Sequence, residues 1–419
     1  MFKGGALLLV ITISLIITLL ITSLILFFYY QRTEIDINLL SMKLVRNANS
    51  GLQLLLSKNQ MVQSNDSLLI DLFDRSEDSI MLKRSTYGLF EIHSATAFHQ
   101  NLSYTKSAMI GSSFSSTLES ALYMVDNNKP LSVCGNTILN GNCYLPEAGV
   151  KRAYIEGQSF IGVNLVNGDI LKSNKSLPTV NKFIMDQISG HFNGTGNANP
   201  EDSLTQWSEV SEDSVFSSFA FKTLKIYSNS SITISNRTLI GNIFLSAKDS
   251  IIVQSSANLE NIILFAPKII FEKNTTAVLQ AFASDTIIVN KNCHFKYPSI
   301  LAVISNDIDM RSVLKIDSTS LIEGLVFSHS SGSIASSTAI SIAPQAVVYG
   351  QVYSSGSLDL KGAVYGNVIC DHFILKTSSS IYENHLLNAE IDANKIDPSF
   401  AFPLLLDDLK MDRTVQWLK

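Results

Sequence analysis

The sequence predicts a mainly β protein with a long amino-terminal helix, a small mixed α/β middle region and a carboxy-terminal β-solenoid. Two observations support this fold class: an uncharged apolar run from Gly4 to Gln31, and short apolar runs that recur between polar corners from Phe216 to about Tyr382. Of the 419 residues, 46% are hydrophobic and only 16% are charged, whereas an average soluble domain has about 25% charged residues. The net charge of −5 leaves no basic surface of the kind that binds nucleic acid, so no nucleic-acid partner is expected.

The first element is a predicted transmembrane helix within residues 1–32. Ala6 to Tyr30 consists almost wholly of Leu, Ile, Val, Phe, Thr and Ser, and a spanning helix needs about 20 such residues. The run is longer than the apolar core of an ordinary signal peptide. Tyr29 and Tyr30 lie where an interfacial aromatic anchor is expected. We therefore expect a single-pass protein that contacts the lipid bilayer through residues 5–31.

Helical periodicity continues over residues 33–63, beyond the predicted span. Apolar residues three or four positions apart form one stripe on a helix here: Ile37, Leu40, Leu44, Ala48, Gly51 and Leu55. This pattern predicts one continuous helix from about Gly5 to about Lys58. Two helices joined by a break near Thr33 are the alternative.

The layout of this helix resembles that of a known protein family. Lys3 to Val10 opens the apolar run, and Asn47-Ala48-Asn49-Ser50-Gly51-Leu52 follows in the extramembrane part. This arrangement resembles the amino-terminal part of minor pilins and pseudopilins of the type IV filament and type II secretion superfamily. The resemblance implies a short leader, and a helix that packs against other pilin-like or secretion-system subunits. Val10 stands where most members carry Glu, counting from a cleavage after Gly5.

Two indicators of membrane orientation disagree. The resemblance implies a cytoplasmic amino terminus, with the bulk of the chain in the periplasm or at the cell surface. The basic residues indicate the opposite, a cytoplasmic bulk, because Lys3 lies on one side of the span and Arg32, Lys43 and Arg46 lie on the other. We favour the family topology and expect an extracytoplasmic bulk.

Residues 64–190 are predicted to be a mixed α/β and Gly-rich strand region. Alternating apolar residues indicate strands at Ser79–Leu82, Tyr87–Ile92 and Ser107–Ile110, and Thr117–Val125 is predicted as a short helix. After Gly135, short strands alternate with Gly corners, which favours turns of a coil over a sandwich.

Residues 191–215 are predicted to be a loop or linker, because Gly190 to Pro200 is rich in Gly and Asn. The Gly residues at 190, 194 and 196 do not form a phosphate loop, since no Lys follows them.

Residues 216–385 are predicted to form the β-solenoid. The distance from Ile243 to Ile262 is 19 residues, and the distance from Ile262 to Ile300 is twice that. A second signal is a glycine that stands just before a short apolar run, at Gly241, Gly324, Gly350 and Gly366. One rung cannot bury its apolar face alone, so successive rungs must stack. A β-sandwich of short strands is the alternative.

These rungs resemble bactofilin-like, polymer-forming solenoids and, more loosely, other β-helices. The right-handed sense of the coil is implied by that resemblance alone. Residues 386–419 are predicted to cap one end, with Leu404-Leu405-Leu406 apolar enough to dock, or else to be a tail that binds a partner.

The chemistry-bearing residues form no catalytic, cofactor-binding or metal-binding motif, so none of these sites and no cofactor is predicted. Cys134 and Cys143 are close enough to bridge adjacent turns, while Cys293 and Cys370 read as small buried hydrophobes. The seven His are scattered, and the adjacent pairs Asp371-His372 and Asp407-Asp408 read as solvated corners. Neighbours in a strand point to opposite faces, so Asp371 and His372 are not expected to cooperate.

The sequence thus favours a non-enzymatic, membrane-anchored structural or interaction protein that presents a β-solenoid. A minor pilin-like or pseudopilin-like component of a secretion or surface filament system fits this description. A membrane-tethered, polysaccharide-active β-helix enzyme is one alternative, and a cytoplasmic, membrane-tethered, polymer-forming scaffold is another.

Overall fold

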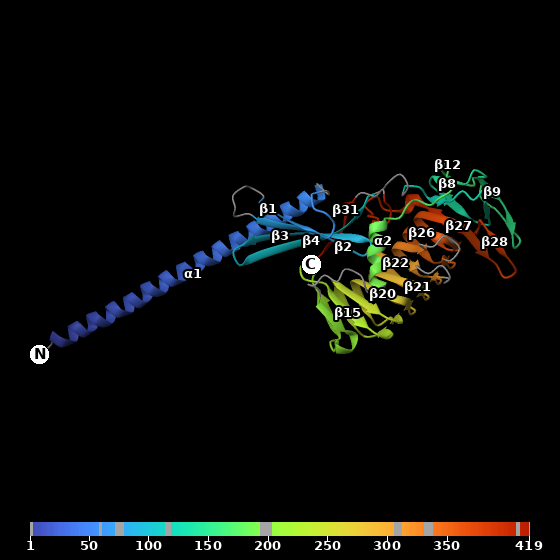
Figure 1. The fold of residues 1–419 in the computed structure, drawn as a ribbon. Coiled ribbons are helices and arrows are strands. Elements are labelled where there is room, and N and C mark those ends of the chain that lie inside the picture. Colours follow the sequence, from blue (N-terminus) through green and yellow to red (C-terminus); the bar gives the residue numbers. More distant parts are fainter. Residues whose placement is uncertain are drawn as a thin grey trace. The chain divides into compact units, whose positions relative to one another are not determined.

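A computed structural model describes residues 3–57, 61–71, 79–113, 119–192, 203–305, 312–330, 338–407 and 411–418. These residues are mainly β-strand, with one long helix at the amino terminus (Figure 1). The chain divides into two compact units, of which the first contains residues 1–83 and 94–106 and the second contains residues 84–93 and 107–419.

Helix α1 spans Lys3–Ser57 without interruption, which confirms the prediction of one continuous helix (Figure 1). Its side chains are exposed as far as Leu39, and from Leu44 onward one face is buried. The buried positions Leu44, Ala48, Gly51 and Leu55 belong to the apolar stripe that the sequence indicates. The amino-terminal part of α1 is long and apolar enough to cross a membrane, and it is the single such helix in the described part of the chain.

One sheet has the strand order β1-β2-β3-β4-β31. Its strands are β1 (Ser67–Asp71), β2 (Ser79–Tyr87), β3 (Phe90–His99), β4 (Leu102–Ser112) and β31 (Met411–Leu418). Two of the three predicted strands, Ser79–Leu82 and Ser107–Ile110, lie within β2 and β4. The third, Tyr87–Ile92, spans the turn at Gly88 and Leu89 between β2 and β3. Strand β31 comes from the predicted tail and pairs antiparallel with the second half of β4.

The remaining strands form what we call the parallel β region, in which most pairings are parallel and, from β13 to β27, join strands one to three positions apart in chain order. They are β5 (Leu122–Met124), β6 (Leu131–Cys134), β7 (Ile138–Asn140), β8 (Cys143–Leu145), β9 (Val150–Arg152), β12 (Ile170–Lys172), β13 (Ser203–Gln206), β14 (Ser214–Ser217), β15 (Leu224–Ser228), β16 (Ile232–Ile234), β17 (Thr238–Gly241), β18 (Ile243–Ala247), β19 (Ser250–Val253), β20 (Asn258–Phe271), β21 (Thr276–Val289), β22 (His294–Ser305), β23 (Ser312–Ile316), β24 (Leu321–Ser330), β25 (Thr338–Ile342), β26 (Val347–Leu360), β27 (Ala363–Lys376), β29 (His385–Leu387) and β30 (Glu390–Asp392). Short antiparallel additions are β28 (Ile381–Glu383), which pairs with β27, and the hairpin of β10 (Tyr154–Ile155) and β11 (Gln158–Ser159).

The recurring glycine motif has a structural cause in this region. Gly324, Gly350 and Gly366 are register partners in β24, β26 and β27. Gly350 has a φ of 138°, and a Cβ placed on it would lie 2.1 Å from the carbonyl oxygen of Gly324. Only glycine allows the strands to approach so closely in this backbone conformation.

Alternate residues of these strands belong to two separate clusters. In β24, Val326 belongs to the larger cluster, which is enclosed by the parallel strands, whereas Leu325 and Phe327 belong to a second, aromatic-rich cluster. Helix α2 (Lys182–Phe192) contributes to this second cluster and contacts β20, where the His191 ring stacks on Phe265 at 4.7 Å between centroids (Figure 1).

The predicted ranges 64–190, 216–385 and 386–419 all supply strands to these sheets, since β30 and most of β29 lie in the predicted tail. Strand β5 pairs with β27, β7 with β30, β6 with β29, and β8 in turn with β5. The tail contributes here as well, because β30 pairs in parallel with β27 and with β7. The strands beyond β27 therefore come both from residues 122–172 and from the predicted tail. In the tail, Leu404, Leu405 and Leu406 are buried in the aromatic-rich cluster.

Two local predictions differ from the structure. The short helix predicted at Thr117–Val125 is wrong, because Leu122–Met124 is strand β5, and residues 117 and 118 lie outside the described residues. The tertiary contact of β5 with β27 outweighs its local helical preference. Parts of the predicted linker 191–215 are strands β13 and β14, while residues 193–202 lie outside the described residues.

Candidate functional site

The most extended candidate surface is the amino-terminal part of α1. Its large apolar side chains from Leu7 to Tyr30 are each between 48% and 67% exposed. Four hydroxyl groups in this stretch, those of Thr12, Ser14, Thr18 and Thr22, donate to carbonyl oxygens of the helix itself, with Thr18 to Ser14 at 2.7 Å and Thr22 to Thr18 at 2.8 Å. A helix with internally satisfied polar groups and apolar side chains on all sides suits a hydrocarbon environment.

The carboxy-terminal part of α1 packs through small residues in the first unit. A Cβ placed on Gly51 would lie 3.0 Å from Ile80 and Leu82 and 3.3 Å from Ala95. Asn49 accepts a hydrogen bond of 2.5 Å from the ammonium group of Lys106. The Ala/Gly motif quoted for the pilin-like resemblance therefore lies at a close contact between helix and strands.

The cysteines are buried free thiols and form no disulfide. Cys134 on β6 donates to the carbonyl oxygen of Leu386 at 3.2 Å. Burial raises the pKa of the Cys143 thiol to about 12, and burial also raises the pKa of Cys134. Thiols with raised pKa values are poor nucleophiles, so these side chains act as core residues.

The expectation that Asp371 and His372 do not cooperate is wrong. Nδ1 of His372 lies 2.7 Å from Oδ2 of Asp371. The register between β26 and β27 shifts between Ser354 and Ser357, so the strands bend at this corner and the alternation of faces breaks down. In the second adjacent pair, Asp407-Asp408, Asp408 lies outside the described residues.

A buried charged cluster of the second unit was not apparent from the sequence. Arg84 on β2 contacts Oε2 of Glu91 on β3 through Nε at 2.9 Å and Nη2 at 2.8 Å, and His93 Nε2 lies 3.1 Å from the same oxygen. All three residues are at most 4% exposed. Since a carboxylate only accepts, Nε2 of His93 carries the proton toward Glu91. This leaves Nδ1 of His93 buried without a partner.

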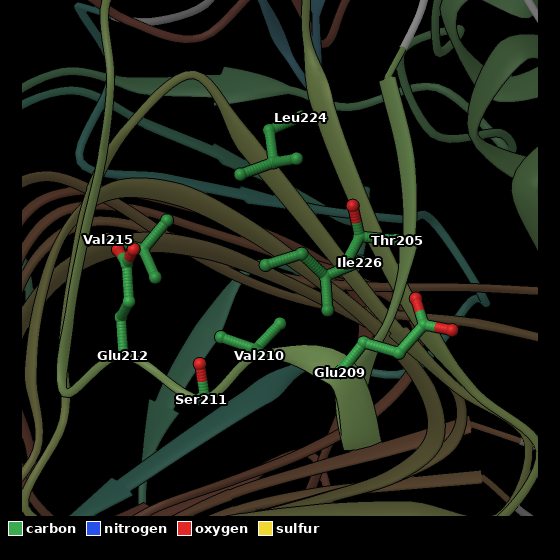
Figure 2. A pocket seen from close by; sticks show the side chains of 8 residues that line it. All are labelled: Thr205, Glu209, Val210, Ser211, Glu212, Val215, Leu224 and Ile226. Carbon is green, nitrogen blue, oxygen red and sulfur yellow. The ribbon is translucent and has the colours of Figure 1, made fainter.

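A pocket of about 180 Å³ lies where the parallel β region begins, between β13, β14 and β15 (Figure 2). We call it the end pocket, and its lining residues are Thr205, Glu209, Val210, Ser211, Glu212, Val215, Leu224 and Ile226. Figure 2 shows Val210 and Ile226 projecting toward one another, with Glu209 and Glu212 on opposite sides of them. The pocket thus combines an apolar floor with two carboxylates.

The turn that forms one wall of the end pocket is held by Arg237. Residues Trp207–Glu209 form the 3-10 helix η1, and the Arg237 guanidinium lies 4.7 Å from the centre of the Trp207 ring. Arg237 also donates to the carbonyl oxygen of Val210 at 2.8 Å. This cation is thereby bound to the wall of the pocket and does not line it.

Metal-binding chemistry has no counterpart in the described ranges: no group of three or more His, Cys, Asp or Glu side chains there could hold a metal ion.

No family model, curated protein or solved structure matches this chain. The geometry described above therefore carries the functional argument alone.

Sequence reasoning missed Glu209 and Glu212 because they lie in the predicted linker 191–215. The one available signal was the apolar pair Val215-Phe216, which is too short to distinguish a strand from a loop. Residues Ser214–Ser217 form strand β14 because they pair with β17, a strand beyond the predicted linker.

Proposed function

We propose that this chain is a membrane-anchored, non-enzymatic structural or interaction protein. In this proposal α1 crosses the bilayer, and the parallel β region is a β-solenoid that extends as a rigid support or binding surface. The single observation that carries the proposal is α1 itself, whose apolar side chains are exposed from Leu7 to Tyr30. About 20 such residues suffice to cross a bilayer.

The solenoid reading is supported by the strand register. Phe244 pairs with Ile263, which pairs with Gln280, which pairs with Ile300, so successive stretches of chain lie side by side in parallel. Parallel neighbours require a return path for the chain, and in a solenoid each turn of the coil supplies it.

A role in a pilin-like or pseudopilin-like assembly is part of the proposal. It is supported by the uninterrupted course of α1 from its apolar part into the packed part at Gly51. In this reading the bulk of the chain lies outside the cytoplasm, and the exposed face of α1 contacts other subunits in the membrane.

The test is protease digestion of intact cells, combined with mass spectrometry of the mature amino terminus. Digestion of the bulk from outside, or from the periplasm after opening of the outer membrane, is the expected result, together with a new terminus at Gly5 or Ala6. A protected bulk with an intact Met1 would refute the exported, pilin-like part of the proposal. Full extraction of the chain by alkaline carbonate would refute the membrane anchor.

The second candidate is a membrane-tethered scaffold in the cytoplasm that assembles end to end. The observation that favours it is an open strand edge at β13 and β14. Within the described residues, β13 pairs with β15 alone and β14 pairs with β17 alone. An unpaired strand edge is a template for pairing with another chain. Protection from external protease, with concentration-dependent sedimentation, would select this candidate.

A further inference from the structure

The two ends of the parallel β region differ in how the enclosed core is closed. At the end formed by β12, Phe160 is 8% exposed and belongs to the core cluster, and the partly buried Leu165 and Val166 pack against that cluster. At the end formed by β13 and β14, Val210, Val215 and Leu224 are only partly buried, and the end pocket lies between them.

The size of the end pocket suits a short aliphatic chain. Its volume is about 180 Å³, slightly more than the roughly 150 Å³ cavity that accommodates one benzene molecule. A chain of four to six carbons therefore fits, whereas drug-sized ligands need about 300 Å³ or more. The floor is Ile226, which is fully buried, so the carbon chain would contact apolar atoms.

The charge of the pocket indicates which polar group the aliphatic ligand carries. Among the described residues, its lining contains the carboxylates of Glu209 and Glu212 and no Lys or Arg. The nearby Arg237 is held between Trp207 and the Val210 carbonyl. Within the same described ranges, Glu209 Oε2 accepts one hydrogen bond, from the Gln206 N–H at 3.3 Å, which leaves acceptor capacity at the rim.

We propose that the end pocket binds a linear primary alkylammonium group, of which the side chain of a lysine on a partner protein is the natural form. The carbon chain lies on Val210, Val215 and Ile226, and the ammonium group lies at the rim, against the carboxylate of Glu209 or of Glu212. This inference goes beyond the proposed function and does not depend on the side of the membrane on which the bulk lies.

The test uses the full chain in lipid nanodiscs with n-hexylammonium chloride as the probe. The chain contains two tryptophans, so the Trp417→Phe variant leaves Trp207, at the wall of the pocket, as the only tryptophan fluorophore. We expect saturable quenching or enhancement by n-hexylammonium, with an apparent Kd on the order of 1 mM for so small a ligand. n-Hexanol should bind about tenfold more weakly and n-hexanoate more weakly still, because two partly exposed carboxylates favour the cation modestly.

Three variants decide the outcome. The E209Q/E212Q variant should bind n-hexylammonium about as weakly as n-hexanol, V215F should fill the pocket and abolish saturation, and the control E272Q should change nothing. Equal binding of the three probes, no saturation, or full affinity in E209Q/E212Q would overturn the proposal. If V215F alters the melting curve, the Gln variants, which preserve side-chain size, still decide the result.

Discussion

The Glu91→Gln substitution tests whether the buried charged cluster stabilises the second unit. Glu91 Oε2 is contacted by Arg84 at 2.8 and 2.9 Å and by His93 at 3.1 Å, and the side chains of Arg84 and Glu91 are only 5% and 3% exposed. Glutamine keeps the size of the side chain and an acceptor oxygen for His93, but it removes the negative charge that lies against the Arg84 guanidinium.

The expected loss follows from this burial. Breaking a buried ion pair from one side costs about 3–5 kcal/mol of unfolding free energy, since an uncompensated charge stays in a poorly solvated site. At about 1.36 kcal/mol per factor of ten, the folded-to-unfolded ratio should fall by roughly two to three and a half orders of magnitude. An exposed carboxylate should show no such effect, and Glu272→Gln is the matched control.

The assay is urea unfolding of the full chain in detergent, followed by tryptophan fluorescence. Trp417 pairs with Ala108 in the sheet that contains the cluster, so its emission reports on this sheet. The double variant E91Q/R84M should regain most of the loss, because Met removes the buried cation that Glu91 contacts and retains apolar volume. A loss below about 1 kcal/mol in E91Q, or no recovery in the double variant, would show that the cluster is not stabilised by its charges.

Three further predictions concern other parts of the chain. Ile16→Arg should shift the chain from the membrane to the soluble fraction in carbonate extraction, since a central arginine costs about 2.5–3.5 kcal/mol of insertion free energy, whereas Leu39→Arg, beyond residues 5–31, should leave it bound. Gly350→Ala should lower the melting temperature, because its Cβ would lie 2.1 Å from a carbonyl oxygen, and Gly149→Ala should lower it less, because nothing lies within 4 Å of that Cβ. Burial raises the pKa of Asp359, so ionisation of this group disfavours the folded state as the pH rises through its unfolded pKa. Asp359→Asn should therefore raise the melting temperature at pH 7, and the difference should disappear near pH 3; an unchanged difference at both pH values would contradict the assignment.

Features carried by a local run of residues were predictable, because their signals do not depend on the rest of the chain. The length and apolarity of residues 5–31 and the stripe from Leu44 to Leu55 predicted α1 as the structure has it. The glycine before a short apolar run was visible in the sequence at Gly324, Gly350 and Gly366, and the structure makes these three residues register partners. In both cases the residues that carry the signal lie close together in the sequence.

Features that join distant parts of the chain were decided by the tertiary structure. Pairing of β5 with β27 joins residues near 122 to residues near 368, and local propensity at Leu122–Met124 contains no information about that partner. The close contact of Asp371 with His372 depends on a bend at one corner, and the end pocket depends on how far Val210 and Val215 fill the core. The sequence by itself determined the helix and the strand-forming pattern, because these arise from the preferences of neighbouring residues. Only the tertiary structure determined the strand order, the buried charges and the pocket, because these arise from contacts between residues that the chain brings together on folding.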